Sequence, residues 1–384
     1  MSNKVLELTK AMVAIPSVNP QEKSAFESPY GEAQIAEFIC NWLKKKNLDA
    51  QIQQVQPNRP NVIAFAPGQN KDKTLLLSGH MDTVDIQQMS IEPFDPQTKD
   101  NRLYGRGSCD TKGPLAALML AFRDRVNAGS LPYNLAFLAT CGEEYNTLGS
   151  SYYAKKTDTK PTSAIFAEPT NLKVVVAHKG IVRLLLTCFG KSAHSATPKL
   201  GANAIYTMNK AILAVKRFAN KLTYNAEHPL LGTETLSLTT IKGGQQINII
   251  PDKCQAELDW RTIPGHTPQQ CLDQLQKAIS EQLPQKKFKL ELLLTYNPMQ
   301  TEPSDPFIQA LLDAVEKTTK SRQITSVPYG TDASPFTHLN IPMAIFGPGN
   351  PDKAHTADEF IEIEQLEKGL DAYKNFLNSN WTLK

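Results

Sequence analysis

The side chains most able to do chemistry are histidines and carboxylates that follow short apolar runs. Four runs, at 75–77, 135–138, 164–167 and 343–346, lead in turn to His80 and Asp82, to Glu143 and Glu144, to Glu168, and to His355. Apolar runs this short, bounded by turn residues, are typical of buried strands in a parallel sheet. The functional crevice of an open α/β sheet lies at the carboxyl ends of its strands, so these side chains should converge there. Two histidines and several carboxylates in one place predict a metal site, and favour one for two metals.

The segments around these residues suggest how the roles divide. Asp110 lies in a glycine-rich turn, 105–113, just before a predicted helix, where its side chain can reach into the crevice. His80 and Asp82 are two apart in an extended segment, so their side chains should point to the same side. Asp82 is therefore expected either to orient the His80 ring, as carboxylates often do for metal-bound histidines, or to bind metal itself. Glu143 and Glu144 are adjacent and should diverge, so that one can bind metal while the other faces the substrate as a base.

The elements that must position these residues form two predicted domains. Helices and strands alternate over the first 174 residues, which predicts a doubly wound α/β domain with a mostly parallel sheet. From residue 175 the pattern becomes strand 181–189, helix 202–220, strands 235–242 and 253–261, helix 268–283 and strand 288–294. This βαββαβ order predicts a ferredoxin-like α+β domain. Because the alternation then resumes, we expect a catalytic domain made of 1–174 and 295–384 and an inserted domain at 175–294.

Composition and charge exclude several classes of protein. The 384 residues are 41% hydrophobic and 21% charged with a net charge of +3, which is ordinary for a globular protein. The absence of a Lys/Arg cluster predicts no nucleic-acid partner. No apolar stretch approaches the roughly 20 residues of a membrane helix, and charges interrupt the apolar residues of the N-terminus, unlike those of a secretory signal. Six irregularly spaced cysteines form no disulfide framework, which favours a cytoplasmic location.

The sequence resembles the dinuclear-zinc amidohydrolases and exopeptidases, a family that includes acetylornithine deacetylase, succinyl-diaminopimelate desuccinylase and carboxypeptidase G. The matching segments run in family order across nearly the whole chain: SGHMDTVD (78–85), YGRGSCDTKGPLAA (104–117), CGEE (141–144), AEPT (167–170), HKG (178–180), GKSAHSATPKLGANAI (190–205), GGQQINIIPDKC (243–254), DWR (259–261), YGTDASPF (329–336) and FGPGNPDKAHTADEFIEI (346–363). The last two segments are most similar to the acetylornithine deacetylase branch.

The resemblance implies a set of metal ligands. His80 and Glu168 would share one metal, Glu144 and His355 would share the other, and Asp110 would bridge the two. The peptide bond that follows Asp110 would be cis. The implied cofactors are two Zn²⁺ ions, for which Co²⁺ or Mn²⁺ could substitute.

The resemblance also implies catalytic roles for three residues. Asp82 would orient His80, and Glu143 would be the general base and acid. Glu143 would take a proton from a water held by the two metals, the resulting hydroxide would attack the acyl carbon, and Glu143 would then protonate the leaving nitrogen. His194 of the inserted domain would help to stabilise the oxyanion, commonly in the centre of the partner subunit. The inserted domain would thus serve as a lid and as the dimerisation surface of a homodimer.

The resemblance further implies that the substrate is a small N-acyl amino acid. Asn248 and Arg261 would bind its carboxylate. In the loop Gly330, Thr331 and Asp332, the aspartate is expected either to recognise a basic side chain such as that of ornithine or to cap the helix that follows. The predicted reaction is the hydrolysis of N-acetylornithine to ornithine and acetate, in arginine biosynthesis.

Other readings use the same residues or different ones. A dipeptidase, a carboxypeptidase or a succinyl-diaminopimelate desuccinylase could have the same metal centre. Hydrolysis through Cys109 or Cys141 is a different chemistry, but neither cysteine lies beside a convincing histidine in the sequence. A non-catalytic metal-binding protein that retains the fold is a further alternative.

Overall fold

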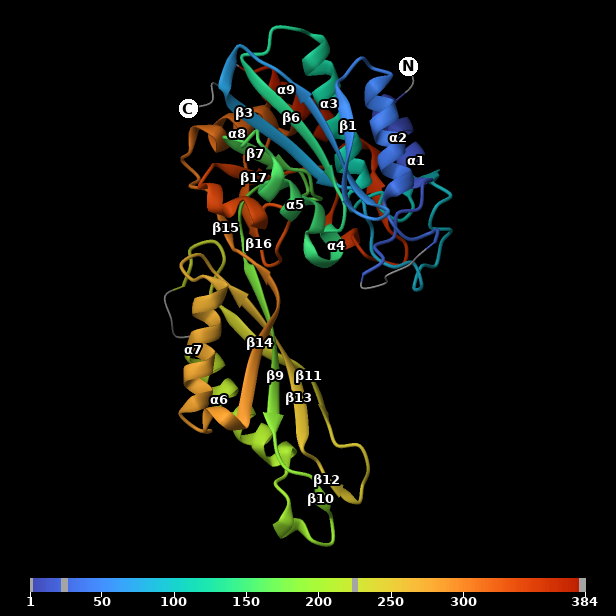
Figure 1. The fold of residues 1–384 in the computed structure, drawn as a ribbon. Helices are drawn as coiled ribbons and strands as arrows, with labels where there is room; N and C mark the ends of the chain where they lie inside the picture. Colours follow the sequence, from blue (N-terminus) through green and yellow to red (C-terminus); the bar gives the residue numbers. More distant parts are fainter. Residues whose placement is uncertain (1–2, 22–26, 223–226, 380–384) are drawn as a thin grey trace. The chain divides into compact units, whose positions relative to one another are not determined.

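The computed structural model describes residues 3–21, 27–222 and 227–379, and it divides the chain into two compact units (Figure 1). The first unit comprises Met1–Val176, Gln300–Thr325 and Thr331–Lys384, and the second comprises Ala177–Met299 and Ser326–Gly330. The division we expected, 1–174 with 295–384 and an inserted 175–294, differs from this one by a few residues at each junction and at Ser326–Gly330. Ser326–Gly330 belongs to the second because its backbone is bonded there: Lys179 N donates to Val327 O at 3.2 Å.

A mixed sheet forms the centre of the first unit. Its strand order is β1-β2-β6-β3-β7-β17-β8-β15, with β16 paired to β8. The strands are β1 (Ala50–Gln56), β2 (Arg59–Ala66), β3 (Asn70–His80), β6 (Tyr133–Thr140), β7 (Ser163–Phe166), β8 (Val174–His178), β15 (Met299–Gln300), β16 (Ile324–Val327) and β17 (Met343–Ile345). Strands β6, β3, β7 and β17 run parallel, whereas β1 pairs antiparallel with β2, β2 with β6, and β8 with β17. The α/β class is thus confirmed, but the sheet is mixed rather than mostly parallel because antiparallel strands flank the parallel ones.

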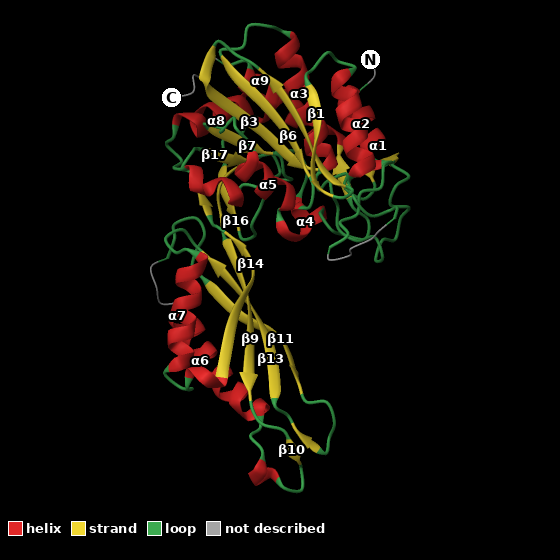
Figure 2. Cartoon of the chain, viewed as in Figure 1, coloured by secondary structure: helices red, strands yellow, loops and turns green. Residues whose placement is uncertain are grey.

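Helices cover both faces of this sheet (Figure 2). Five pack on one face, namely α1 (Lys4–Val13), α2 (Ala33–Lys44), α3 (Lys112–Asn127), α8 (Pro306–Thr319) and α9 (Ile363–Leu377). Helix α3 is buried from Lys112 through Phe122, as expected of a helix that is apolar on all sides. The other face carries α5 (Leu148–Lys156) and the 3-10 helix η3 (Ser334–Leu339), where Phe336 lies 5.4 Å from the Phe166 ring. None of the helices in the described ranges is long and apolar enough to cross a bilayer.

Short elements complete the first unit. Strands β4 (Gln97–Lys99), β5 (Arg102–Tyr104) and β18 (Phe360–Glu362) form a small sheet in the order β18-β5-β4. The single-turn helix α4 (Glu143–Asn146) follows β6, and the 3-10 helix η4 (Pro351–Lys353) precedes His355.

The second unit has the βαββαβ order predicted for it. Its antiparallel sheet has the strand order β11-β13-β9-β14. The elements follow the chain as β9 (Gly180–Phe189), β10 (Ala193–His194), η1 (Pro198–Leu200), α6 (Ala204–Leu222), β11 (Thr235–Gly243), β12 (Ile249–Ile250), β13 (Lys253–Thr262), α7 (Pro268–Ser280), η2 (Gln285–Lys287) and β14 (Phe288–Tyr296). Helices α6 and α7 cover one face (Figure 1), where Phe218 packs edge-on against Trp260 at 5.2 Å. The ferredoxin-like class is confirmed.

Candidate metal centre

Neighbouring strands of the first unit bring the predicted metal ligands to one edge of the sheet. Strand β3 ends at His80, β6 leads to Glu144, β7 leads to Glu168, and β17 leads through η4 to His355. The central strands β6, β3, β7 and β17 are adjacent and parallel, so their carboxyl ends lie together. Asp110 enters the same region from the turn before α3.

Asp110 lies between the two histidines. Its Oδ1 is 3.0 Å from Nε2 of His80, and its Oδ2 is 3.2 Å from Nε2 of His355. The two imidazoles therefore face the two oxygens of a single carboxylate. The ligand atoms of His80, Asp110 and Glu144 all lie within 4.8 Å of one another. The peptide bond between Asp110 and Thr111 is cis.

Each histidine has a glutamate of its own. Oε2 of Glu168 is 3.8 Å from Nε2 of His80, whereas the two carboxylate oxygens of Glu144 are 3.1 and 3.2 Å from Nε2 of His355. The arrangement thus consists of two His–Glu groups that share one aspartate. Imidazole nitrogens and carboxylate oxygens are the ligands that zinc takes in catalytic sites, so the donor set fits a pair of such ions.

Burial and mutual charge shift the titration of these groups. Burial opposes protonation of His355, but its contacts with Asp110 and Glu144 raise its pKa to about 11. Burial likewise opposes a charged His80, and Glu168 and Asp110 nevertheless hold its pKa well above the usual value. Burial first, and then the charge of Asp110, raise the pKa of Glu144 to about 7. The carboxylates thus create a strong demand for positive charge at this point, which bound cations would satisfy.

Asp82 supports this group in a way that the sequence did not indicate. Nδ1 of His80 donates to the main-chain oxygen of Asp82 at 2.9 Å, so the backbone rather than the carboxylate orients the ring. The carboxylate lies 3.6 Å from Nδ1 and instead accepts bonds from the backbone N–H groups of Glu143 and Glu144, at 3.0 and 3.1 Å, and from Asn19 at 2.7 Å. Asp82 therefore holds the start of α4.

Glu143 is the first residue of α4, next to the predicted ligand Glu144. Desolvation raises the pKa of its carboxyl well above the usual value; the charge of His80 opposes this rise, and Glu168, Asp332 and Glu144 add to it. A raised pKa makes the Glu143 carboxylate a better proton acceptor, which is the property that a general base needs.

Asp332 does not cap the helix that follows it, and both of its carboxylate oxygens have partners within the protein. It is buried, and its two oxygens accept hydrogen bonds from the hydroxyls of Thr140, at 2.5 Å, and Ser150, at 2.6 Å. The following helix, η3, has no side-chain cap. Thr331 Oγ1 instead accepts a bond from the backbone N–H of Ala333 at 3.2 Å. The carboxylate of Asp332 therefore ties the end of β6 to α5 instead of presenting free oxygens to a substrate.

The predicted substrate-binding residues of the second unit fall into two groups. His194 lies exposed in the two-stranded antiparallel sheet of β10 and β12, and the next residue, Ser195, donates its N–H to the main-chain oxygen of Asn248 at 2.9 Å. Strand β13 begins at Lys253, soon after β12, and Arg261 lies near its other end. The distance from Lys253 to Arg261 along the strand is about 26 Å at roughly 3.3 Å per residue. There its guanidinium pairs with Asp259, with Nε 2.6 Å from Oδ1. Within this unit, then, His194 and Asn248 are neighbours and Arg261 is not with them. Gly330 also belongs to the second unit, where it lies against the ring of Tyr296.

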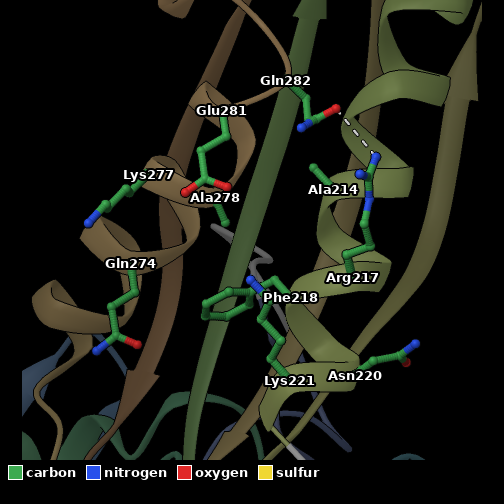
Figure 3. Close-up of a pocket in the computed structure, with 10 residues that line it drawn as sticks. All are labelled: Ala214, Arg217, Phe218, Asn220, Lys221, Gln274, Lys277, Ala278, Glu281 and Gln282. Carbon is green, nitrogen blue, oxygen red and sulfur yellow. Dashed lines mark hydrogen bonds between the residues drawn. The ribbon is translucent and has the colours of Figure 1, made fainter.

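A surface hollow between α6 and α7 has a different character (Figure 3). It is lined by lysines, amides and Glu281, and Arg217 bonds to Gln282 across it at 3.4 Å. None of the predicted site residues lines it. The cysteine chemistry considered above is also disfavoured, because burial raises the pKa of both Cys109 and Cys141 well above the usual value.

Sequence reasoning missed several buried polar residues around the ligand turns. Glu32 and Arg59 are buried, yet no motif in the sequence distinguishes them. Arg106, also buried, lies in the segment quoted at 104–117, where its spacing gives no indication of its contacts. Asn61 does carry a signal, because it is a polar residue directly before the apolar run of a buried strand. Glu359 lies in the segment quoted around His355, where its spacing gives no indication of its contacts.

Comparison with known proteins agrees with this geometry. The sequence model of Peptidase family M20/M25/M40 matches residues 76–379. An acetylornithine deacetylase of Vibrio campbellii is 31% identical over 374 residues, which cover 95% of this chain and 96% of that protein. An M20 family metallo-carboxypeptidase from Sulfolobus solfataricus has a similar fold, with a TM-score of 0.78 and 19% identity over 97% of this chain and 98% of that one. The YXEP protein of Bacillus subtilis, a dinuclear metal-binding peptidase of the M20 family, matches with a TM-score of 0.70 and 15% identity over 97% and 96% of the two chains. The chain therefore belongs to Peptidase family M20/M25/M40 and is a metal-dependent hydrolase.

Proposed function

We propose that this enzyme hydrolyses the amide bond of N-acyl amino acids, with N-acetylornithine as its substrate and ornithine and acetate as its products. One observation carries the hydrolase chemistry: two histidines face the two oxygens of Asp110, and each has its own glutamate. The choice of substrate is supported by the similarity to acetylornithine deacetylase over nearly the full length of both chains.

In this proposal the ligands divide as the distances suggest. His80 and Glu168 hold one cation, His355 and Glu144 hold the other, and Asp110 bridges them. We propose zinc for both, with Co²⁺ or Mn²⁺ as substitutes, because the donors are imidazole nitrogens and carboxylate oxygens. When bound, two such ions acidify a water and polarise the acyl carbonyl of the substrate.

Glu143 moves the protons. Its carboxylate takes a proton from the attacking water and later gives it to the amide nitrogen as the bond to the acyl carbon breaks. Asp82 keeps Glu143 and Glu144 in place through their backbone N–H groups. Amine and carboxylate products form with no covalent acyl-enzyme.

The second unit contributes to substrate binding. Arg261 binds the α-carboxylate of the substrate, exchanging part of its pairing with Asp259 for it. His194 and Asn248 lie together at the far end of β13, which supports a role for them in a different centre from the one that Arg261 serves. We therefore propose a homodimer in which His194 reaches the centre of the partner subunit, acting in the cytoplasm in arginine biosynthesis.

A substrate panel on protein loaded with Zn²⁺ or Co²⁺ tests the proposal. We expect N-acetylornithine to be hydrolysed with the highest kcat/KM, ahead of N-acetylmethionine, N-succinyl-diaminopimelate and dipeptides. If the enzyme prefers a dipeptide or the succinyl compound, the proposed substrate is wrong, but the proposed metal-dependent amide hydrolysis still holds. Hydrolysis of none of these compounds by protein with two bound metal ions would refute the deacylase proposal.

A further inference from the structure

We propose that two buried arginine–glutamate pairs, Arg59–Glu32 and Arg106–Glu359, are positioning devices that hold the two turns carrying the predicted metal ligands. Each glutamate uses one arginine to neutralise its charge and a remaining bonding position to fix backbone N–H groups of a ligand turn. The inference rests on the ligand assignment of the proposed function, and it concerns residues outside that ligand set.

The turn that carries Glu143 and Glu144 is held from outside at four successive backbone N–H groups. Cys141 N donates to Oδ1 of Asn61 at 3.1 Å, and Gly142 N donates to Oε1 of Glu32 at 3.1 Å. The next two N–H groups donate to the two oxygens of Asp82, at 3.0 and 3.1 Å. Helix α4 has only four residues and no cap from its own side chains. Because so short a helix is not stable alone, these outside acceptors must define where its two glutamates point.

Glu32 reaches this turn across a long stretch of sequence. It is fully buried and pairs with Arg59, which is also buried: Nε is 2.5 Å from Oε2 and a terminal nitrogen is 2.7 Å from Oε1. The same Oε1 accepts the N–H of Gly142. One carboxylate oxygen is therefore shared between the guanidinium and the backbone of the ligand turn.

The second pair repeats the arrangement at the turn that carries Asp110. Oε1 of Glu359 accepts hydrogen bonds from the backbone N–H groups of Cys109, at 2.9 Å, and Asp110, at 3.0 Å. Its Oε2 pairs with Arg106 at 2.7 Å, and both side chains are buried. Arg106 is fixed in turn by a bond of 3.1 Å to the main-chain oxygen of Asp85.

A role in stability alone does not account for this pattern. Replacing a buried ion pair with well-packed apolar side chains is often neutral for stability or even stabilising, so such pairs are poor stability devices. A metal centre, in contrast, requires its ligands within about 0.5 Å of the productive geometry, held by supporting hydrogen bonds. Both glutamates direct bonds to the backbone of ligand turns. Loss of such supporting partners typically lowers metal affinity or activity by about 10- to 100-fold.

The test compares metal affinity, kinetics and unfolding in four variants. Glu32→Gln and Glu359→Gln weaken one clamp each, and the double variant Glu32→Leu/Arg59→Met removes the first pair without leaving an unpaired charge. Glu234→Gln is the control, because Glu234 is a buried carboxylate of the second unit that accepts a backbone N–H, from Ile263 at 3.4 Å. Affinity for Zn²⁺ and Co²⁺ is measured by competition with a chromophoric chelator. The constants kcat and KM are measured with N-acetylornithine as substrate, and stability is measured by thermal unfolding.

The two clamps should differ in their effect on the metals. We expect the Glu32 variants to have an affinity for one of the two ions that is about 10- to 100-fold lower. They should also have a lower kcat, while KM changes little. Glu359→Gln should lower the affinity for both ions, because Glu359 holds the turn of Asp110 and the carboxylate of Asp110 contacts both His80 and His355. The control should retain both affinities and kcat, whatever its melting temperature.

Each other outcome has a definite meaning. If the double variant folds and keeps native metal affinity and kcat, the pair is structural and the inference is overturned. If all the Glu32 and Glu359 variants fail to fold, the residues serve folding rather than ligand geometry, and the inference is again overturned. If the wild-type protein itself binds fewer than two ions, the proposed function fails, which the measurement on the wild type reveals before any variant is examined.

Discussion

The adjacent residues Glu143 and Glu144 offer the sharpest test of the site, because the same substitution should have different effects at the two positions. In Glu143→Gln the side chain keeps its size, and the backbone N–H can still donate to Asp82. In Glu144→Gln the change removes one of the carboxylates that lie 3.1–3.2 Å from Nε2 of His355. The first variant should lose the base, and the second should lose a metal ligand.

The magnitudes follow from these positions. General acid–base catalysis contributes about 10²- to 10⁴-fold, so Glu143→Gln should lower kcat by that factor, equivalent to about 3–5 kcal/mol of barrier. Its metal content should stay at two ions. Burial and the neighbouring carboxylates raise the pKa of Glu143 above that of an unfolded glutamate, so the charged carboxylate costs stability at pH 7. The free energy of unfolding of the metal-free variant should therefore be unchanged or higher than that of the wild type.

The assay combines kcat on N-acetylornithine, metal content by elemental analysis after dialysis, and urea unfolding of the metal-free proteins. Glu144→Gln should retain about one metal ion. It should lose turnover because it loses the second ion. If Glu143→Gln loses metal and turnover together, base and ligand have been exchanged in our assignment. If it retains more than about a tenth of the wild-type kcat, a smaller loss than general-base catalysis gives, Glu143 is not the base.

Four further measurements check other parts of the account. Chelation should abolish turnover and lower the melting temperature, since a ligand at 100 times its Kd adds about 2.7 kcal/mol of stability; turnover that survives full metal removal would contradict a metal centre. Burial lowers the pKa of His178 from 6.5 to about 4, so the folded state resists protonation and should lose about 2 kcal/mol of stability between pH 7 and pH 5. In urea unfolding, His178→Asn should lose less stability than the wild type between pH 7 and pH 5. An equal loss in the variant and the wild type would exclude His178 as its source. Asp332→Asn should lower kcat/KM equally for N-acetylornithine and N-acetylmethionine, because Asp332 is bonded to hydroxyls of the protein; a selective loss on the ornithine compound would restore it to substrate recognition. Arg261→Ala should raise the KM for N-acetylornithine and leave unchanged the KM for the analogue that lacks the α-carboxylate. Equal changes in the two KM values would argue against a contact between Arg261 and the carboxylate.

The sequence predicted those parts of the site that depend on strand ends. His80 and Glu168 follow apolar runs that are neighbouring parallel strands, so their convergence is a direct consequence of the fold class. The pairing of β17 with β7 could not be predicted in this way, because nothing in the local sequence shows that a strand after the second unit returns beside β7. The apolar run at 343–346 did predict that His355 lies at the same edge of the sheet, but its pairing with Glu144 on one metal depended on the family resemblance.

The contacts of individual carboxylates were less predictable. The alternation of side chains in a strand led us to expect the Asp82 carboxylate beside the His80 ring, and it lies 3.6 Å from Nδ1. Its hydrogen bonds with the backbone N–H groups at the start of α4 could not be predicted from that alternation. Asp332 similarly found hydroxyl partners on β6 and α5, far away in the sequence. Buried polar partners of this kind are set by tertiary packing, and a local pattern carries no information about which distant side chain arrives.

The position of β17 has a consequence for how the protein is made. This strand stands between β7 and β8, although the ribosome synthesises it after the entire second unit. A nascent chain therefore cannot close its main sheet or bring His355 to Asp110 until almost all of it has emerged. Until then the edge of β7 is exposed and able to pair with other chains, so translation that stops early should leave an aggregation-prone fragment without the complete set of metal ligands.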